Sequence, residues 1–145
     1  MLVHQILKSK AKTGVLTVAS NAKVAEAARV LAENKIGSVV VSDDGGQTAS
    51  GILSERDIVR ELAGSGGSCL DQPVSAYMTA KLVTCTSNNS AQELLTTMTE
   101  GRFRHMPVVE DGKMIGLVTL GDVVKAQLSE LAMEKEALQG MIMGH

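Results

Sequence analysis

Short runs of β-branched residues alternate along the first half of this chain with segments whose apolar residues recur at helical spacing. After an amphipathic start over residues 1–14, three strands are predicted, at 15–18, 38–41 and 51–53. Two helices are predicted, from a cap at Ser20 and Asn21 to about Asn34 and from Glu55 to Ala63. Residues 43–46, Asp-Asp-Gly-Gly, predict a turn between the second and third strands.

The same order of elements recurs after a glycine- and serine-rich segment, residues 64–68, which predicts a flexible connector. The second half predicts three strands, at 83–85, 106–109 and 115–118. Ser90 and Glu93 form a capping box that opens the helix between the first two strands, and a last helix begins near Leu120. Each half is therefore predicted to fold as β-α-β-β-α.

The repeat is clearest in a heptapeptide that occurs once in each half. Residues 51–57 read Gly-Ile-Leu-Ser-Glu-Arg-Asp and residues 116–122 read Gly-Leu-Val-Thr-Leu-Gly-Asp, an offset of 116 − 51 = 65. A unit of about sixty residues buries little surface by itself, so the two halves should pack into one module. The predicted fold is α/β of the α+β type, with two repeats packed pseudo-symmetrically.

The composition restricts what such a module can bind. The chain has 145 residues, one Phe, one Tyr, no Trp and a net charge of −2, so neither a base-stacking surface nor a basic nucleic-acid footprint is expected. Cys69 and Cys85 have no CxxC spacing and the three His are scattered, so no metal site is expected. No signal peptide or membrane helix is visible, and a cytoplasmic protein is the expectation.

Catalytic signatures do not accompany the repeat. The sequence has no GxSxG elbow, Walker loop, HExxH motif or Rossmann GxGxxG. Asp57 and Asp122 have no base or metal ligand set beside them in the sequence, and catalytic pairs rarely arise by duplication of one half. We therefore predict no catalytic residues, and an enzyme that acts on nucleotides is the disfavoured class.

The order of these motifs resembles a known family. Lys-Ile-Gly-Ser-Val-Val-Val at 35–41, Asp-Asp-Gly and the heptapeptide resemble a pair of cystathionine-β-synthase-type (CBS) domains, the Bateman module of stand-alone bacterial proteins. The resemblance implies repeats at 5–66 and 74–130, with a helical tail at 131–145. It also implies an adenosine-containing ligand, such as AMP, ADP, ATP, NAD(H) or S-adenosylmethionine, in the cleft between the repeats.

The hydroxyl and aspartate of each heptapeptide allow two interpretations. Ser54 with Asp57, and Thr119 with Asp122, fit a helix capping box. Alternatively, the preceding glycine would let a ligand approach the strand closely, and the helix N-terminus would suit phosphate. The resemblance implies that the aspartate binds ribose hydroxyls and that the hydroxyl residue lies near ribose or phosphate.

A basic cluster precedes one predicted strand of the second half. Arg102, Arg104 and His105 could bind phosphate, with a solvated loop as the alternative. The resemblance implies that Arg104 and His105 face ligand phosphates and that Met106 and Pro107 line the pocket. If His105 contacts phosphate, binding should weaken as pH rises through about 6.5.

The corresponding place in the first half, Ile36-Gly37-Ser38, has no cation. This site should take a less charged ligand, stay empty, or borrow a cation from Arg56 or a neighbouring chain. A surface position on its helix is the alternative for Arg56.

The resemblance also assigns residues to the base pocket. One wall would come from the segments at 15–18 and 83–85, including Thr17, Val83 and Thr84, and the other from Ile36 and Met106. Core packing is the alternative for all of these, and the better one for Val15, Leu16 and Val83.

An apolar stripe follows the second repeat. It comprises Val124, Leu128, Leu131, Leu138 and Ile142 at heptad-like spacing, interrupted by Lys135. The stripe could pack on its own domain or against a second subunit, and Met133, Met141 and Met143 suit an adaptable contact surface. Because CBS pairs commonly form homodimers, the resemblance favours a homodimer.

The resemblance thus implies a regulatory sensor that binds an adenosyl ligand and signals to an unidentified protein partner. The alternative is a ligand-free dimerisation or scaffold protein in which Asp57 and Asp122 only cap helices. Replacing Asp122 with Ala distinguishes these interpretations, because only the first predicts a loss of ligand affinity.

Overall fold

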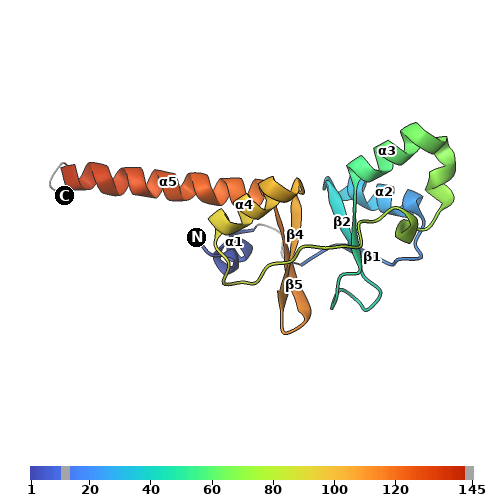
Figure 1. The fold of residues 1–145 in the computed structure, drawn as a ribbon, viewed down its shortest axis with the longest axis horizontal. Coiled ribbons are helices and arrows are strands. Elements are labelled where there is room, and N and C mark those ends of the chain that lie inside the picture. Colours follow the sequence, from blue (N-terminus) through green and yellow to red (C-terminus); the bar gives the residue numbers. More distant parts are fainter. Residues whose placement is uncertain (11–13, 143–145) are drawn as a thin grey trace. The chain divides into compact units, whose positions relative to one another are not determined.

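The protein was described in a computed structural model that covers residues 1–10 and 14–142 (Figure 1). These residues gather into two compact units. Unit 1 draws its described residues from 1–13, 84–109 and 116–145, and unit 2 from 14–83 and 110–115. Each unit has its own hydrophobic core.

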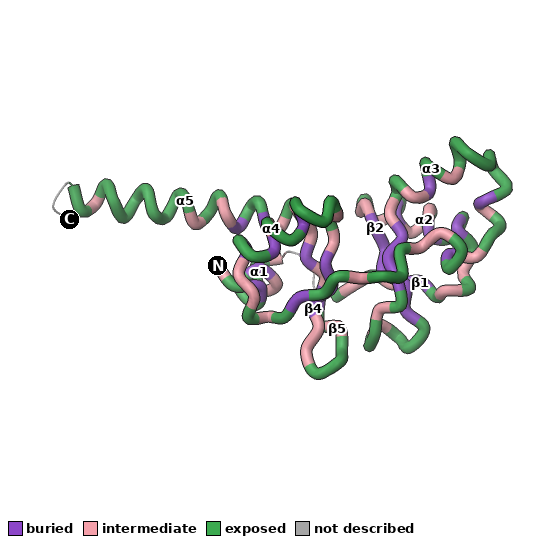
Figure 2. Tube along the Cα trace, in the orientation of Figure 1, coloured by how far each residue is buried: buried purple, intermediate pink, exposed green. Residues whose placement is uncertain are grey.

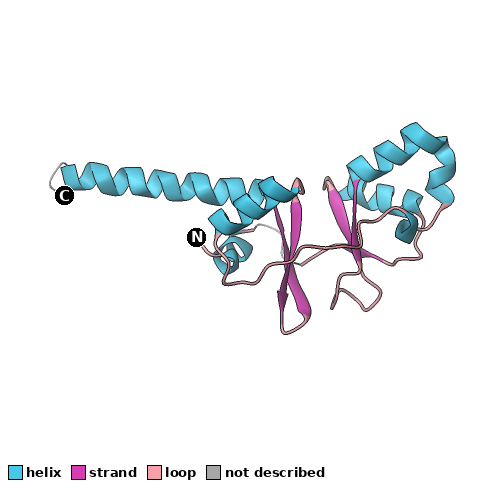
Figure 3. Ribbon diagram, viewed as in Figure 1, coloured by secondary structure: helices cyan, strands magenta, loops and turns pink. Residues whose placement is uncertain are grey.

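Unit 2 is built on a three-stranded sheet (Figure 3). Its elements are β1 (Thr17–Val18), α2 (Val24–Asn34), β2 (Ser38–Val41), β3 (Gly51–Ser54), α3 (Glu55–Ser65) and the 3₁₀ helices η1 (Gly66–Asp71) and η2 (Val74–Ala76). Strand β2 is central, parallel to β1 and antiparallel to β3. Val24, Ala27 and Leu31 of α2 are buried with Val39 and Val41 of β2, which follows from their helical and strand spacing.

Unit 1 repeats this plan with a different start. Its elements are α1 (Val3–Ser9), α4 (Ala91–Gly101), β4 (His105–Glu110), β5 (Lys113–Thr119) and α5 (Leu120–Ile142). The core includes Leu94 and Met98 of α4, Val108 of β4 and Val118 of β5. The predicted capping box of α4 is confirmed, because Ser90 Oγ accepts from the Glu93 N–H at 3.1 Å.

Helix α1 folds with the second half of the sequence. Val3 and Ile6 are buried in the core of unit 1. The Val3 N–H donates to the Asn89 carbonyl at 2.9 Å, and the Ala91 N–H donates to the Met1 carbonyl at 2.9 Å. The N-terminal segment therefore completes unit 1, a placement that no local pattern predicts.

Two predictions about local structure are wrong in unit 2. Helix α2 begins at Val24 without a side-chain cap, because the Gln72 carbonyl accepts from the Val24 N–H at 2.9 Å and replaces the expected cap at Ser20 and Asn21. Residues 64–68 are not a flexible connector. They belong to the end of α3 and to η1, which the burial of Cys69 holds in place.

The first strand predicted for each half is shorter than expected. β1 contains only Thr17 and Val18, and within 83–85 only Cys85 pairs, in a parallel bridge to Val108. Leu16 and Val83 are each 44% exposed, so their predicted core placement is wrong. Because each segment meets its partner strand for only one or two residues, the residues before that contact lie nearer the surface.

The apolar stripe of the tail lies on α5 but is not packed against the described part of the chain. Leu128, Leu131 and Leu138 are 62%, 60% and 59% exposed, and Figure 2 shows α5 exposed along most of its length. Packing of the stripe on its own domain is therefore wrong, whereas packing on a second subunit stays a prediction. Met143 lies outside the described residues. No described helix is both long and apolar enough to cross a membrane.

Candidate functional site

A strand runs directly into a helix in each unit, and a hydroxyl and an aspartate meet at the junction. In unit 2, Ser54 Oγ accepts from the Asp57 N–H at 3.2 Å and Asp57 Oδ2 accepts from the Ser54 N–H at 2.9 Å. In unit 1, the same bonds join Thr119 and Asp122 at 3.1 and 2.9 Å. Both pairs are therefore helix caps, as the first interpretation of the heptapeptide predicts.

The neighbouring strand is held to each of these helix starts by a backbone hydrogen bond. The Glu55 N–H donates to the Gly37 carbonyl at 2.9 Å, and the Leu120 N–H donates to the Arg104 carbonyl at 2.8 Å. Gly37 and Arg104 thus occupy equivalent positions. The hydroxyl and aspartate of each half therefore lie beside the start of the neighbouring strand, where unit 2 has Gly37 and unit 1 has Arg104.

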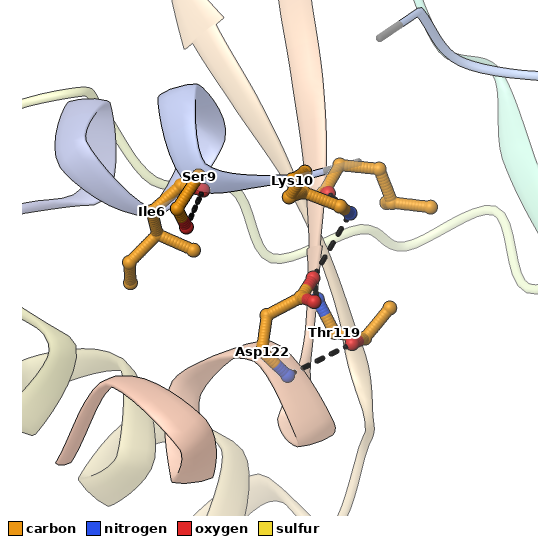
Figure 4. Close-up of polar contacts among 6 residues, drawn as sticks. Ile6, Ser9, Lys10, Thr119 and Asp122 are labelled. Carbon is orange, nitrogen blue, oxygen red and sulfur yellow. Dashed lines mark hydrogen bonds and ion pairs between the residues drawn. The ribbon is translucent and has the colours of Figure 1, made fainter. Parts of the chain in front are cut away.

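Lys10 joins the unit 1 site, although no sequence motif points to it. Its Nζ lies 2.9 Å from Asp122 Oδ2 and donates to the Leu117 carbonyl at 2.8 Å (Figure 4). The side chains of Lys10 and Asp122 are 27% and 24% exposed, so the ion pair is partly shielded from solvent. Its partner is 112 positions away in the sequence (122 − 10 = 112), which is why local motifs do not reveal it.

The packing of Leu7 explains how Lys10 reaches this site. A Cβ on Gly116 would lie 2.7 Å from Leu7 Cδ2, so the Leu7 side chain of α1 packs directly over this glycine of β5. In unit 2, a Cβ on Gly51 would lie 2.5 Å from Met78 Sδ. The heptapeptide glycines are expected to let a ligand approach the strand closely. That expectation is wrong for the space that a Cβ would occupy, because the side chains of Leu7 and Met78 fill it.

Opposing effects set the protonation of the unit 1 site. Burial alone would raise the pKa of Asp122, but hydrogen bonds from Thr119 and Lys10 outweigh it and hold this pKa below its ordinary value. Burial lowers the pKa of His105, and the nearby charges of Arg104 and Lys10 lower it further against the opposing effect of Asp122. The site therefore combines an ionised carboxylate with an imidazole that favours its neutral form.

The unit 2 site has a different electrostatic character. Asp57 has Arg60 at 4.0 Å, and the side chain of Glu55 lies beside Gly37, with Oε1 3.6 Å from where a Cβ would stand. Ser38 is only 5% exposed, and its hydroxyl has no hydrogen-bond partner among the described residues. Buried hydroxyls are normally hydrogen-bonded, so this one is available to a ligand.

The remaining predicted site residues differ in exposure. Arg56 and Thr84 are exposed, Thr17 and Ile36 are half-buried, and Pro107 is buried in β4. Met106 is 1% exposed within the core of unit 1, so core packing accounts for it, and its role in a ligand pocket stays a prediction.

The described residues include neither a cluster of metal ligands nor an exposed cysteine. Within residues 1–10 and 14–142, no group of three or more His, Cys, Asp or Glu is placed so that it could hold a metal ion. Cys85 is buried, and burial raises its pKa to about 11. A thiol with this pKa is protonated and unreactive at neutral pH, as expected for a buried cysteine.

Comparison with known proteins identifies the family. The CBS domain model matches the chain twice, at residues 5–64 and 74–129. The chain belongs to the CBS domain family. The two matches correspond to the two sequence repeats, so the tandem CBS pair and its α+β fold are confirmed.

Similar CBS proteins come from bacteria and plants. The crystal structure of the CBS-domain containing protein ATU1752 from Agrobacterium tumefaciens has a TM-score of 0.82 and 43% identity, and covers 88% of this chain and 99% of that one. The mitochondrial CBS domain-containing protein CBSX3 of Arabidopsis thaliana is 34% identical over 98% of this chain and 72% of its own.

A solved complex is also similar to this CBS pair. The CBS domain pair of protein MJ0100, in complex with 5′-methylthioadenosine and S-adenosyl-L-methionine, has a TM-score of 0.75 and 25% identity, and covers 87% of this chain and 98% of that one. Adenosine-containing ligands therefore bind at least one CBS pair of this fold.

Proposed function

We propose that this CBS pair is a regulatory module that binds an adenosine-containing ligand beside the N-termini of α3 and α5. The observation that carries the proposal is the free oxygen of Asp122. The cap and Lys10 both use Oδ2, and no described residue donates a hydrogen bond to Oδ1. An aspartate can thus cap its helix and still accept from a ribose hydroxyl, so the two interpretations of the motif are compatible.

Other features support the same ligand class. The N-termini of α3 and α5 suit an anion. Arg104 and His105 lie beside α5 in unit 1. The adenosine compounds bound by MJ0100 fit such a site. The candidate ligands are AMP, ADP, ATP, NAD(H) and S-adenosylmethionine, and signalling passes to a partner by a shift between two conformations.

The first test is mass spectrometry of the small molecules released when the freshly purified protein is denatured, quantified per chain. A stoichiometric adenine nucleotide supports the proposal. If none is released, calorimetric titration with each candidate ligand follows, and the absence of binding at millimolar concentration overturns the proposal.

A substitution at Asp122 separates binding from capping. Asp122→Asn keeps an oxygen that can accept from the Thr119 N–H but loses the charge, so the helix cap is largely retained. We expect ligand affinity to fall roughly tenfold or more while the free energy of unfolding falls by about 1 kcal/mol. Asp111→Asn, in the turn between β4 and β5, is the matched control. Equal affinity in the two variants would contradict a ligand role for Asp122.

The exposed stripe on α5 favours a second function, dimerisation. Leu128, Leu131 and Leu138 are more than half exposed and recur at heptad-like spacing on one helix. Solvent exposure of a regular leucine stripe is unfavourable, and a second copy of α5 would cover it. We propose a homodimer that exists with or without ligand. If titration shows no adenosyl ligand, dimerisation is the function that remains.

A further inference from the structure

The ion pair between Lys10 and Asp122 places a cation beside the carboxylate that we propose binds ribose. Lys10 follows α1 directly, and its Nζ contacts both Asp122 Oδ2 and the Leu117 carbonyl. Leu7, one turn before Lys10, packs against Gly116 and so helps to position the end of α1. Figure 4 shows the lysine side chain extending from the end of α1 toward the carboxylate.

Positive charges outnumber negative charges around His105 in the unit 1 site. Two permanent cations, Lys10 and Arg104, act on His105 together with one carboxylate, Asp122. The equivalent place in unit 2 has Gly37 with the carboxylate of Glu55 beside it. The unit 1 site therefore has one more positive charge than it needs to balance Asp122. An anionic group on the ligand would neutralise that excess, whereas a neutral ligand would not.

A single ribose hydroxyl can use the open Oδ1 of Asp122, but a ribose diol that binds both carboxylate oxygens competes with Lys10 for Oδ2. Such a ribose weakens the ion pair and leaves the half-buried ammonium with the Leu117 carbonyl alone. A phosphate on the same ligand would give Lys10 a new anionic partner. The exchange then leaves Lys10 paired with phosphate and Asp122 hydrogen-bonded to ribose, whereas an unphosphorylated nucleoside leaves the ammonium without an anionic partner.

We propose that Lys10 determines the ligand class of the unit 1 site, selecting adenosine ligands that carry phosphate over those that carry none. The lysine moves from Asp122 to the phosphate as ribose takes the carboxylate. This inference rests on the proposed function, because it presupposes that adenosine ligands bind beside α5.

The test compares AMP with adenosine, which differ only in the phosphate, by calorimetric titration of the full chain. In the Lys10→Met variant, which keeps the aliphatic stem, we expect AMP to bind roughly tenfold more weakly and adenosine to bind as tightly as before or more tightly. Lys10→Arg should retain the preference for AMP. Lys8→Met is the matched control, since Lys8 lies exposed on the same segment and should leave both affinities unchanged.

The outcomes separate this inference from the proposed function. Equal weakening of AMP and adenosine in Lys10→Met, or an unchanged ratio of the two affinities, overturns the role of Lys10 and leaves adenosine binding intact. If neither compound nor any other candidate binds the wild-type chain, the proposed function fails and the inference fails with it.

A second measurement does not depend on the folding of Lys10→Met. Reductive ¹³C-methylation labels the lysines of the wild-type chain, and comparison with Lys10→Arg assigns the Lys10 signal. We expect AMP to shift that signal more than adenosine does, and equal shifts would overturn the proposal.

Discussion

At the scale of single residues, Asp122 shows how one side chain serves structure and recognition together. Its Oδ2 caps α5 and pairs with Lys10, while the described residues leave Oδ1 without a donor. The capping box could be predicted from the sequence because it is local, spanning four residues. Lys10 could not, because its contact depends on the long-range packing of α1 in unit 1.

His105 carries a prediction about pH. Burial lowers its pKa, so the unfolded chain takes up a proton at higher pH than the folded chain does. The free energy of unfolding should therefore be unaffected by His105 above about pH 6.5 and should fall as the pH drops below that value. We expect His105→Asn to flatten this dependence in urea unfolding measured from pH 7.5 to 5.

The control for this measurement is His4→Asn, because His4 is exposed on α1. That variant should keep the wild-type pH dependence, and identical slopes for wild type and His105→Asn would contradict the prediction. The same lowered pKa corrects the expectation for phosphate binding. The window in which protonated His105 aids binding lies below pH 6.5 in the free protein.

At the scale of elements, hydrophobic spacing predicts the order of strands and helices. The predictions that are wrong concern segments whose structure depends on contacts with residues far away in the sequence. The carbonyl of Gln72 replaced the expected cap of α2, and burial of Cys69 ordered a segment rich in glycine and serine. The sequence shows that the heptapeptide glycines repeat. The side chains that pack on them lie far away in the sequence, so residues near each glycine do not predict these contacts.

These two glycines predict unequal costs of substitution. A Cβ on Gly51 would meet Met78 Sδ at 2.5 Å and the Thr79 backbone oxygen at 3.0 Å, whereas a Cβ on Gly116 would meet only the flexible Leu7 side chain under 3.4 Å. We expect Gly51→Ala to lower the free energy of unfolding by roughly 1–3 kcal/mol and Gly116→Ala by less. Denaturant unfolding measures both.

A double substitution tests the cause. Leu7→Ala removes the side chain that a Cβ on Gly116 would meet, so Gly116→Ala should cost less in that background than in the wild type. Strictly additive costs would show that Leu7 is not what requires glycine at position 116.

At the scale of the whole molecule, α5 is the element whose surface the described chain leaves uncovered. The helix runs from Leu120 to Ile142, yet its buried residues are confined to Val123 and Ala126 in the first two turns. The heptad-like spacing was visible in the sequence, but only the structure distinguishes a stripe that packs on its own domain from one that stays exposed.

The dimer prediction belongs to this scale. Replacing Leu128 and Leu131 with Glu puts two charges into the stripe and should convert a dimer to a monomer in light scattering at micromolar concentration. Ser129→Glu is the control, because Ser129 lies on the same helix about 140° from the centre of the stripe. A wild-type monomer, or a dimer unaffected by both leucine changes, would contradict the prediction.

The position of α1 bears on how the chain folds during synthesis. Val3 and Ile6 are synthesised well before the residues that bury them, which lie between Cys85 and Ala126. Most of unit 2 is synthesised by residue 83 and can begin to fold before the residues that cover the apolar face of α1 have been made. Helix α1 is thus made before unit 2 but can be buried only after it, so its apolar face stays exposed while the residues between are synthesised.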